Sequence, residues 1–168
     1  MILGRKGSGS EQFKKATVSL TDAQVKALPT TIVEIVAAPG PGKVLIPTYV
    51  LLRLLAAVDY ANIDGDAYLK VDHGLGGAFV SLLFQASGFV SAFLQPGDPT
   101  DGIHASMLPT QVKHPVTSMS GADTGFYDSD IVNKALAMSA YNGASGDFTG
   151  GNAANVLTVT VFYATIEF

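Results

Sequence analysis

The stretch NVLTVTVFYATIEF, residues 155–168, decides the fold that we expect for this chain of 168 residues. Apolar side chains occupy every second position from Leu157 to Tyr163, and Thr158 and Thr160 lie between them. A period of two residues is typical of a β-strand with one face turned to a core. The segment therefore predicts a long strand that forms part of an antiparallel sheet.

The last part of this segment has apolar side chains on both faces. Phe162, Ile166 and Phe168 belong to the set of positions that is polar earlier in the strand. A strand that is apolar on both faces is covered on both faces. In a chain this small, we expect another subunit to provide the second cover.

Short apolar segments recur through the rest of the chain, separated by turns that use many of its 18 Gly and eight Pro residues. The sequence TDAQ at 21–24 is a capping box, and it predicts a short helix that ends before Pro29. We expect strands at residues 16–20, 32–38, 43–46, 49–58, 67–71, 78–84, 89–94, 131–141 and 155–168, and one more within 103–116.

This pattern predicts an all-β fold, a β-sandwich or jelly roll with one short N-terminal helix. Residues 16–168 are expected to form a single sandwich domain. Residues 1–15, rich in Gly, Ser and basic residues, are expected to form a flexible or extended arm. The alternative is an α+β fold, which would require residues 49–58 and 131–141 both to be helices.

The composition excludes several classes of site and partner. The chain has no Cys, which excludes disulfides, thiolate metal sites and cysteine nucleophiles. Its formal net charge is −4, so we expect no nucleic-acid partner. The most apolar stretch, residues 44–58, contains Pro47 and Arg53 and is shorter than the roughly 20 residues that cross a bilayer. We therefore expect a protein made in a cytoplasm, with no leader peptide and no membrane partner.

One motif has a weak resemblance to a metal site. Asn62, Asp64 and Asp66 present oxygen-bearing side chains at alternate positions, as the opening of a calcium loop does. Ala67 stands where such a loop needs Gly, and His73 stands where it needs a bidentate Glu. The interpretation that we favour is a turn in which these side chains hydrogen-bond to the backbone.

No catalytic motif is present. His73, His104 and His114 lack the spacing of a zinc site, and Gly7-Ser8-Gly9-Ser10 does not fit a nucleophile elbow. The glycines at 74, 76 and 77 lack the spacing of a phosphate-binding loop. We therefore expect no enzyme, no catalytic residue and no cofactor.

The low charge content is the main functional signal. Charged residues make up 14% of the chain, against roughly 25% in a typical soluble domain. Monomers rarely expose large apolar patches, so we expect part of the surface to be buried between subunits. The residues that we expect at a subunit or capsid interface are Arg5, Lys6, Phe13, Lys14, Lys15, Phe162, Ile166 and Phe168.

Two segments carry a resemblance to a known group of proteins. The run SLTDAQVKALPTTIVEIVAAPGPGKVLI, residues 19–46, resembles the opening of small virion proteins of tailed bacteriophages. In those proteins a Leu-Thr-x-Ala-Gln-x-Lys-x-Leu-Pro segment precedes an apolar strand and a Pro/Gly turn. The closing run, from Leu136 through GDFTGGNAANVLTVTVFYATI at residues 146–166, is similar to their final strand after a Gly-Gly-Asn turn, whereas residues 47–135 show no match.

The resemblance implies a capsid decoration or cement protein, located in the virion and made in the cytoplasm of a bacterial host. It implies a β-sandwich or jelly roll that forms a homotrimer and binds the major capsid protein or another virion protein. The alternative is a tail, fibre or baseplate component that binds a host receptor, with Phe126, Tyr127 and Tyr141 stacking on sugar rings. A small carbohydrate-active enzyme is the third candidate.

Overall fold

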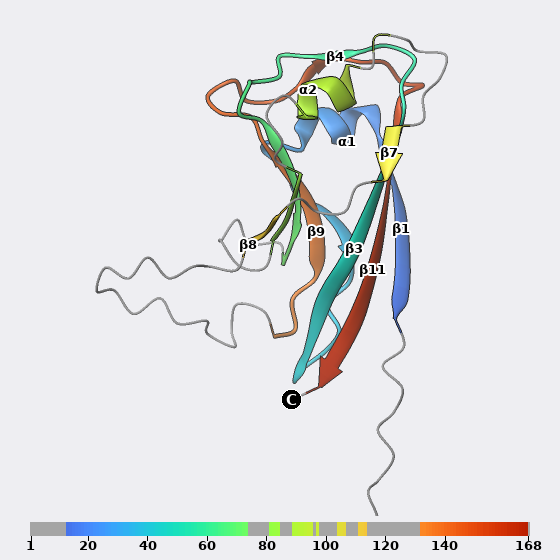
Figure 1. Cartoon of the computed structure of the whole chain (residues 1–168), viewed down its shortest axis with the longest axis vertical. Coiled ribbons are helices and arrows are strands. Elements are labelled where there is room, and N and C mark those ends of the chain that lie inside the picture. The colour runs from blue at the N-terminus through green and yellow to red at the C-terminus, as the bar shows by residue number, and fades with distance from the viewer. Residues whose placement is uncertain are drawn as a thin grey trace, which may run out of the picture.

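The computed structural model describes residues 13–73, 81–84, 89–95, 97, 104–106, 111–113 and 132–167. Strands and two short helices alternate along this part of the chain (Figure 1). In chain order the elements are β1 (Lys14–Thr21), α1 (Asp22–Ala27), β2 (Val33–Val36), β3 (Lys43–Leu55), β4 (Tyr60–Ala61), β5 (Tyr68–Asp72), β6 (Ser81–Phe84), α2 (Phe89–Leu94), β7 (His104–Ser106), β8 (Gln111–Lys113), β9 (Leu136–Tyr141), β10 (Thr149–Gly150) and β11 (Val156–Glu167).

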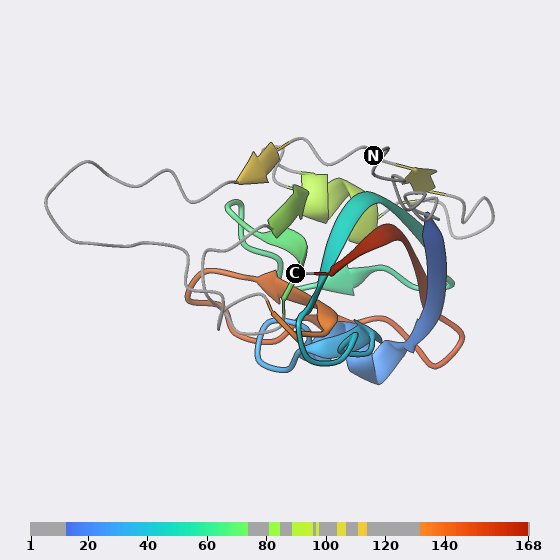
Figure 2. The ribbon, with the colours of Figure 1, turned by 90° about the horizontal axis from the view of Figure 1, so that it is seen from below.

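The strands form two main sheets, and every strand pair is antiparallel. The first, here called the long sheet, has the order β1-β11-β3-β7, and the second has the order β2-β9-β5-β6-β8. Strands β4 and β10 form a separate two-stranded ribbon. Figure 2 shows how β1, β11 and β3 curve together. The prediction of an all-β fold is confirmed in this broad sense, and the α+β alternative is wrong because β3 and β9 occupy the segments that it needed as helices.

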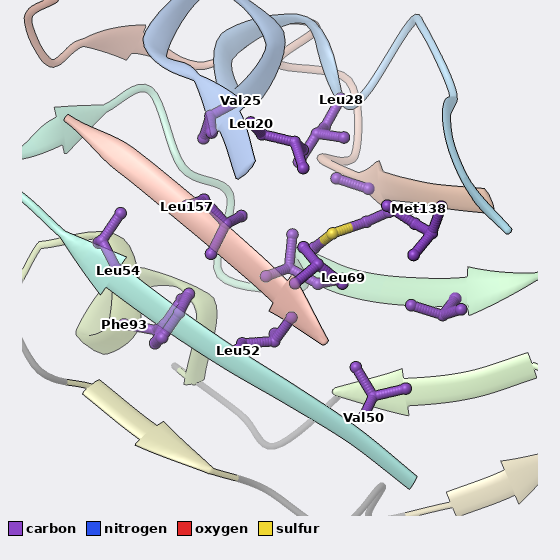
Figure 3. Close-up of a cluster of buried hydrophobic side chains, with 14 of the residues drawn as sticks. Leu20, Val25, Leu28, Val50, Leu52, Leu54, Leu69, Phe93, Met138 and Leu157 are labelled. Carbon is purple, nitrogen blue, oxygen red and sulfur yellow. The ribbon is translucent and has the colours of Figure 1, made fainter. Parts of the chain in front are cut away.

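One hydrophobic core lies between the two main sheets. The long sheet contributes Leu52 and Leu157, the second sheet contributes Leu69 and Met138, and α1 contributes Val25 (Figure 3). All five side chains are almost completely excluded from solvent. Removing apolar surface from water is the main source of stability in such a core. The two sheets therefore depend on each other for their stability.

Strand β11 is the predicted strand at the end of the chain, and it lies inside the long sheet. It pairs along its length with β1 on one side and β3 on the other. Leu157, Val159 and Val161 are fully buried in the core, as their spacing predicts. The alternation that is visible in the sequence thus corresponds to two faces of one central strand.

Two of the predicted strands, 43–46 and 49–58, are one continuous strand in the structure. The register of β3 against β11 shifts between Phe162 and Tyr163, so that Thr48 is the additional residue of a bulge. The Thr48 hydroxyl donates to the Phe162 carbonyl at 3.0 Å. Pro47 is tolerated beside this bulge because a bulge interrupts the ladder that a proline cannot complete.

The prediction of a strand at residues 89–94 is wrong, because this segment is helix α2. Val90, Phe93 and Leu94 are buried, and their spacing of three and four residues is that of a helix face. A run of six residues in which five are apolar fits a buried strand equally well on composition. Contact of α2 with β5 gives the helix its covered face.

Other differences concern short strands. The single strand expected within 103–116 is two strands, β7 in the long sheet and β8 in the second sheet. Strand β10 lies between the segments expected as strands at 131–141 and 155–168, and it pairs with β4. No helix among the described residues is long and apolar enough to cross a membrane.

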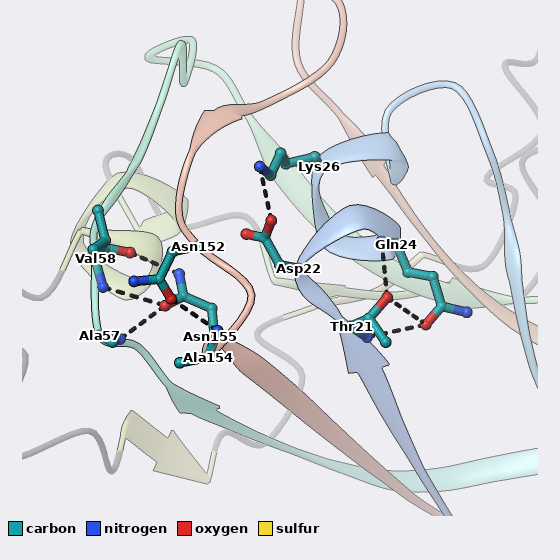
Figure 4. Close-up of polar contacts among 9 residues, drawn as sticks. All are labelled: Thr21, Asp22, Gln24, Lys26, Ala57, Val58, Asn152, Ala154 and Asn155. Atoms are coloured by element: carbon teal, nitrogen blue, oxygen red, sulfur yellow. Dashed lines mark hydrogen bonds and ion pairs between the residues drawn. The ribbon is translucent and has the colours of Figure 1, made fainter.

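The capping box at the start of α1 is confirmed. The Gln24 amide donates to the Thr21 hydroxyl at 3.4 Å, and the Thr21 amide donates to the Gln24 side chain at 3.0 Å (Figure 4). Lys26 forms an ion pair of 2.7 Å with Asp22 one turn earlier. These contacts satisfy amides that a helix start leaves unpaired, and they place α1 over one end of the core.

Candidate assembly surface

The outer face of the long sheet is the surface formed by the side chains of β1, β11 and β3 that point away from the core. Residues opposite one another in the register share a face, so the alternation along β11 identifies this set. The outer face consists of Lys15, Thr17, Ser19 and Thr21 on β1, Val156, Thr158, Thr160 and Phe162 on β11, and Tyr49, Leu51, Arg53 and Leu55 on β3.

An aromatic row crosses the lower part of the outer face. Lys15 is opposite Phe162, and Phe162 is opposite Tyr49. The rings of Tyr49 and Phe162 are tilted by 53° with centroids 5.7 Å apart, and the Lys15 ammonium lies 6.0 Å from the Phe162 centroid. Both rings are only half-buried in the single chain. They form an apolar surface with a positive rim, which is the composition of an interface core rather than of a wetted sheet.

The centre of the outer face is polar but uncharged. The hydroxyls of Thr17 and Thr160 are 3.0 Å apart and satisfy each other, although Thr160 is buried. Leu51 is the neighbour of Thr160 on β3. Hydroxyls that bond to each other need little water, so this part of the face can be covered at a low desolvation cost.

The upper part of the outer face ends in an exposed apolar side chain. Leu55 is 52% exposed and is opposite Val156. Arg53 and Lys15 are the charged residues of the outer face, and both are positive. The face therefore carries no negative charge, in a chain whose formal net charge is −4.

Charge is also separated along the long axis of the molecule. The lower end, where β1 and β3 begin in Figure 1, carries the lysines Lys14, Lys15, Lys43 and Lys134. Among the described residues, the loops at the opposite end carry the carboxylates Asp59, Asp64, Asp66 and Asp147. Glu167, opposite Lys43 on β11, is also at the lower end, so lysines and a carboxylate are mixed there with the lysines in excess. The outer face as defined above carries only positive charges.

The structure brings some of the predicted interface residues together and separates others. Lys14 and Lys15, expected in the arm, are the first residues of β1, and the Lys14 ammonium donates to the Thr165 hydroxyl at 3.3 Å. Phe13 is 70% exposed and Ile166 is 37% exposed. Tyr49 was not predicted as an interface residue, because its place beside Phe162 depends on the bulge in β3. The remaining predicted residues, Arg5, Lys6 and Phe168, lie outside the described residues.

A second feature of the surface is a groove between α1 and the start of β2. Its volume is about 400 Å³. Ile32, at its margin, is 52% exposed, whereas Ile35 is buried in the core. Strand β2 is at the edge of the second sheet in the described part of the chain, so one side of its backbone lacks a partner strand. The groove is lined by Ala23, Gln24, Ala27, Thr31, Ile32, Val33 and Glu34.

The weak calcium candidate has the geometry of a turn. The Asp64 carboxylate accepts from the Asp66 amide at 3.0 Å, and the Asn62 side chain donates to the carbonyls of Ser145 and Asp147, at 2.8 Å each. Among the described residues, no three acidic or histidine side chains gather as a metal centre would require. These side chains organise two loops by hydrogen bonds.

Buried asparagines hold the loops at the upper end, and sequence reasoning missed them. Asn155 accepts from the amides of Ala57 and Val58 at 2.8 and 3.2 Å and donates to the Val58 carbonyl at 2.6 Å (Figure 4). Asn142 accepts from the Asp64 amide at 2.8 Å. Their partners are far away in sequence, and a loop-forming Asn gives no signal that it will be buried.

Tyr60 and His73 are titratable groups that are buried at different places in the fold. Burial raises the pKa of Tyr60 to about 12, and the nearby Asp22 carboxylate adds to the shift while Asn155 opposes it. The Tyr60 hydroxyl and one Asp22 oxygen have no hydrogen-bond partner. His73, at the end of β5, is also buried and lies 2.8 Å from the Leu45 carbonyl through its Nε2.

An aromatic pair lies on the second sheet. Tyr68 and Tyr141 are opposite each other on β5 and β9, with centroids 5.0 Å apart and rings 20° from parallel. Tyr141 is 46% exposed. The other two aromatic residues expected to bind sugar, Phe126 and Tyr127, lie outside the described residues.

Comparisons with known proteins identify no relative of this chain. No protein family model, no curated protein and no solved structure matches the chain. The resemblance at residues 19–46 and 146–166 therefore rests on those residues alone.

Proposed function

We propose that this chain is a structural subunit of a bacteriophage virion that decorates or cements the capsid through symmetric contacts. The single observation that carries the proposal is the outer face of the long sheet. It combines Tyr49, Phe162 and Leu55 with few charges on one exposed surface. A surface of this composition favours coverage by a protein neighbour over coverage by water.

Charge selects the kind of neighbour. The outer face carries Lys15 and Arg53, and the lower end adds Lys14, Lys43 and Lys134. An acidic partner surface complements both regions, and like-charge repulsion disfavours a basic one. The proposed partner is therefore an acidic area of the major capsid protein or of another virion protein.

Symmetry makes weak contacts sufficient. A homotrimer presents three copies of the same surface, so a second and third contact form at high effective concentration once the first is made. Each contact then needs little affinity of its own. A jelly-roll or sandwich subunit arranged as a trimer would hold neighbouring shell subunits together in this way, without any chemical reaction.

The proposal is tested on assembled shells. Shells saturated with the wild-type chain are compared, under heating and osmotic shock, with bare shells and with shells exposed to the double variant Tyr49→Ser, Phe162→Ser. We expect protection by the wild-type chain and at least a tenfold loss of shell binding by the variant, since buried aromatic residues dominate interface energies. Tyr141→Ser, on the other sheet, is the matched control and should protect normally. Equal resistance of bare and decorated shells would contradict the proposal.

The aromatic pair on the second sheet supports a second candidate function, binding of a host receptor glycan. The Tyr141 ring is exposed and backed by Tyr68, with exposed Asp66 two residues before Tyr68. An aromatic face with a carboxylate nearby suits the C–H groups and hydroxyls of a sugar ring. The chain has no Trp, so its fluorescence comes mainly from its six Tyr residues, two of which form this site, and Tyr141→Ala identifies the part of any change that arises there. Titration with a panel of soluble oligosaccharides should change the fluorescence of wild type but not of Tyr141→Ala.

A further inference from the structure

The groove beside β2 and the N-terminal end of β1 share an unusual property. Phe13 is 70% exposed and Ile32 is 52% exposed, which places both among the most exposed large apolar side chains of the described chain. Each immediately precedes a paired strand, Phe13 before β1 and Ile32 before β2. A contact between Phe13 and Ile32 would bury both side chains.

The two residues belong to different ends of the molecule. Phe13 immediately precedes Lys14, the first residue of β1 at the lower end, whereas the groove lies against α1 at the upper end (Figure 1). The core and β1 separate them within one copy, because β1 runs from the lower end up to α1. This separation favours a contact between Phe13 of one copy and Ile32 of another over a contact within one copy.

We infer that the groove between α1 and β2 binds the N-terminal segment, residues 4–13, of a second copy of this chain. This inference rests on the proposed assembly function and names the contact that joins the copies. The segment extends the second sheet by pairing with the open edge of β2, and Phe13 fills the apolar groove beside Ile32. Adding a strand to an exposed edge is an established way for an extended segment to bind.

The shape and length of the two partners are compatible. The groove has a volume of about 400 Å³ and an apolar lining that includes Ala23, Ala27 and Val33. Residues 1–12 precede Phe13, and a chain of that length spans up to about 40 Å when extended. A phenyl ring therefore has room in the groove, and the segment is long enough to reach a neighbour.

Charge favours this occupant over other segments of the chain. The N-terminal segment and the residues just after it carry Arg5, Lys6, Lys14 and Lys15, with Glu11 as the acidic residue among them. Glu34 is the charged residue that lines the groove, and it is exposed. Residues 4–13 hold Arg5, Lys6 and Glu11, a net charge of +1, and they meet a groove whose charged lining residue is Glu34. The exchange of segments between copies closes into a pair or ring when every groove is filled.

The test uses the absence of cysteine from the natural chain. Two full-length variants, Phe13→Cys and Ile32→Cys, are mixed at a concentration where the wild-type chain associates and are then mildly oxidised. We expect a disulfide that joins the two variants, formed on the order of tenfold or more faster than by random encounter, because docking raises the effective concentration of the thiols. The matched control is Phe13→Cys mixed with Val58→Cys, since Val58 is also an exposed apolar residue, at 44%, and is not part of the outer face.

The outcomes separate this inference from the proposed function. Cross-linking of Phe13→Cys to Ile32→Cys well above the Val58→Cys control supports the inference. Equal rates for the two mixtures, in a chain that still associates by mass, overturn the inference and leave the assembly function standing. A chain that does not associate at all overturns both. The charge reversal Glu34→Lys should slow the specific cross-link while leaving the control rate unchanged.

Discussion

The two faces of β11 differ in a way that separates folding from assembly. The inner side chains, Leu157, Val159 and Val161, are fully buried among residues of the second sheet. The outer side chains include Thr158 and Phe162, which remain partly accessible to solvent. Both sets lie on one strand with the same backbone pairing. A single strand can thus contribute one face to the core and keep the other face available to a partner.

The largest effect is expected on the inner face. Leu157→Ala deletes a fully buried side chain and leaves a cavity, so we expect the free energy of unfolding to fall by about 3 kcal/mol. Urea denaturation measures the change through the midpoint. Thr158→Ala, one position away on the outer face, should change stability by no more than about 0.5 kcal/mol. Similar losses for the two variants would break the distinction between the faces.

The next effect concerns the ionisation of a buried side chain. The outer face carries charged side chains, whereas the interior disfavours a charge. Burial raises the pKa of Tyr60 to about 12, against about 10 in an unfolded chain. The contribution of the Tyr60 phenol to the free energy of unfolding is therefore fully present below pH 10. It is lost as the pH rises from 10 through 12, and the loss is on the order of 3 kcal/mol. We expect urea midpoints to fall more steeply over this range in wild type than in Tyr60→Phe. Parallel curves for the two proteins would show that the phenol is not excluded from water.

A smaller effect on free energy is expected for association through the outer face. Phe162→Ala removes the ring that contacts Tyr49 and lies beside Lys15. We expect the dissociation constant of the assembly to rise about tenfold, which corresponds to about 1.4 kcal/mol. Sedimentation equilibrium measures this constant, and Tyr141→Ala on the second sheet is the control. A Phe162→Ala chain that associates as tightly as wild type would remove the outer face from the interface.

The smallest effect is expected in the centre of the outer face. Thr17→Val removes one hydroxyl of the 3.0 Å pair with Thr160 while keeping the branched shape that suits a strand. We expect a loss of about 0.5 to 1 kcal/mol in unfolding free energy, the net value of one hydrogen bond. A double-mutant cycle with Thr160→Val isolates the pair, because the second substitution should then cost less than it does alone. Full additivity would mean that the hydroxyls prefer water to each other.

Local patterns in the sequence predicted the elements that depend on neighbouring residues. The alternation from Leu157 to Val161 predicted β11, and the TDAQ sequence predicted the cap of α1. Both signals come from residues within one turn or a few positions of each other. Helix α2 was predicted as a strand because its six residues are too few to show a helical period clearly. The apolar composition of the segment then favoured a buried strand.

Features that depend on distant partners were not visible in the sequence. The bulge at Thr48 joins two expected strands and puts Tyr49 beside Phe162, and this requires knowledge of the register between β3 and β11. The burial of Asn155 likewise depends on carbonyl and amide groups of residues 57 and 58. The sequence predicted individual interface residues such as Lys15 and Phe162. Their arrangement on one surface depends on the pairing of β1, β11 and β3.

The most direct test of the account is the mass of the full-length chain in solution at micromolar concentration, measured by sedimentation equilibrium. A neighbour-covered outer face predicts a defined multiple of the 17.4 kDa chain mass, three being the expected number, which falls toward a single chain when Tyr49 and Phe162 are both replaced by Ser. A stable species of 17.4 kDa at every concentration, for wild type and variant alike, would contradict the claim that another molecule covers this face.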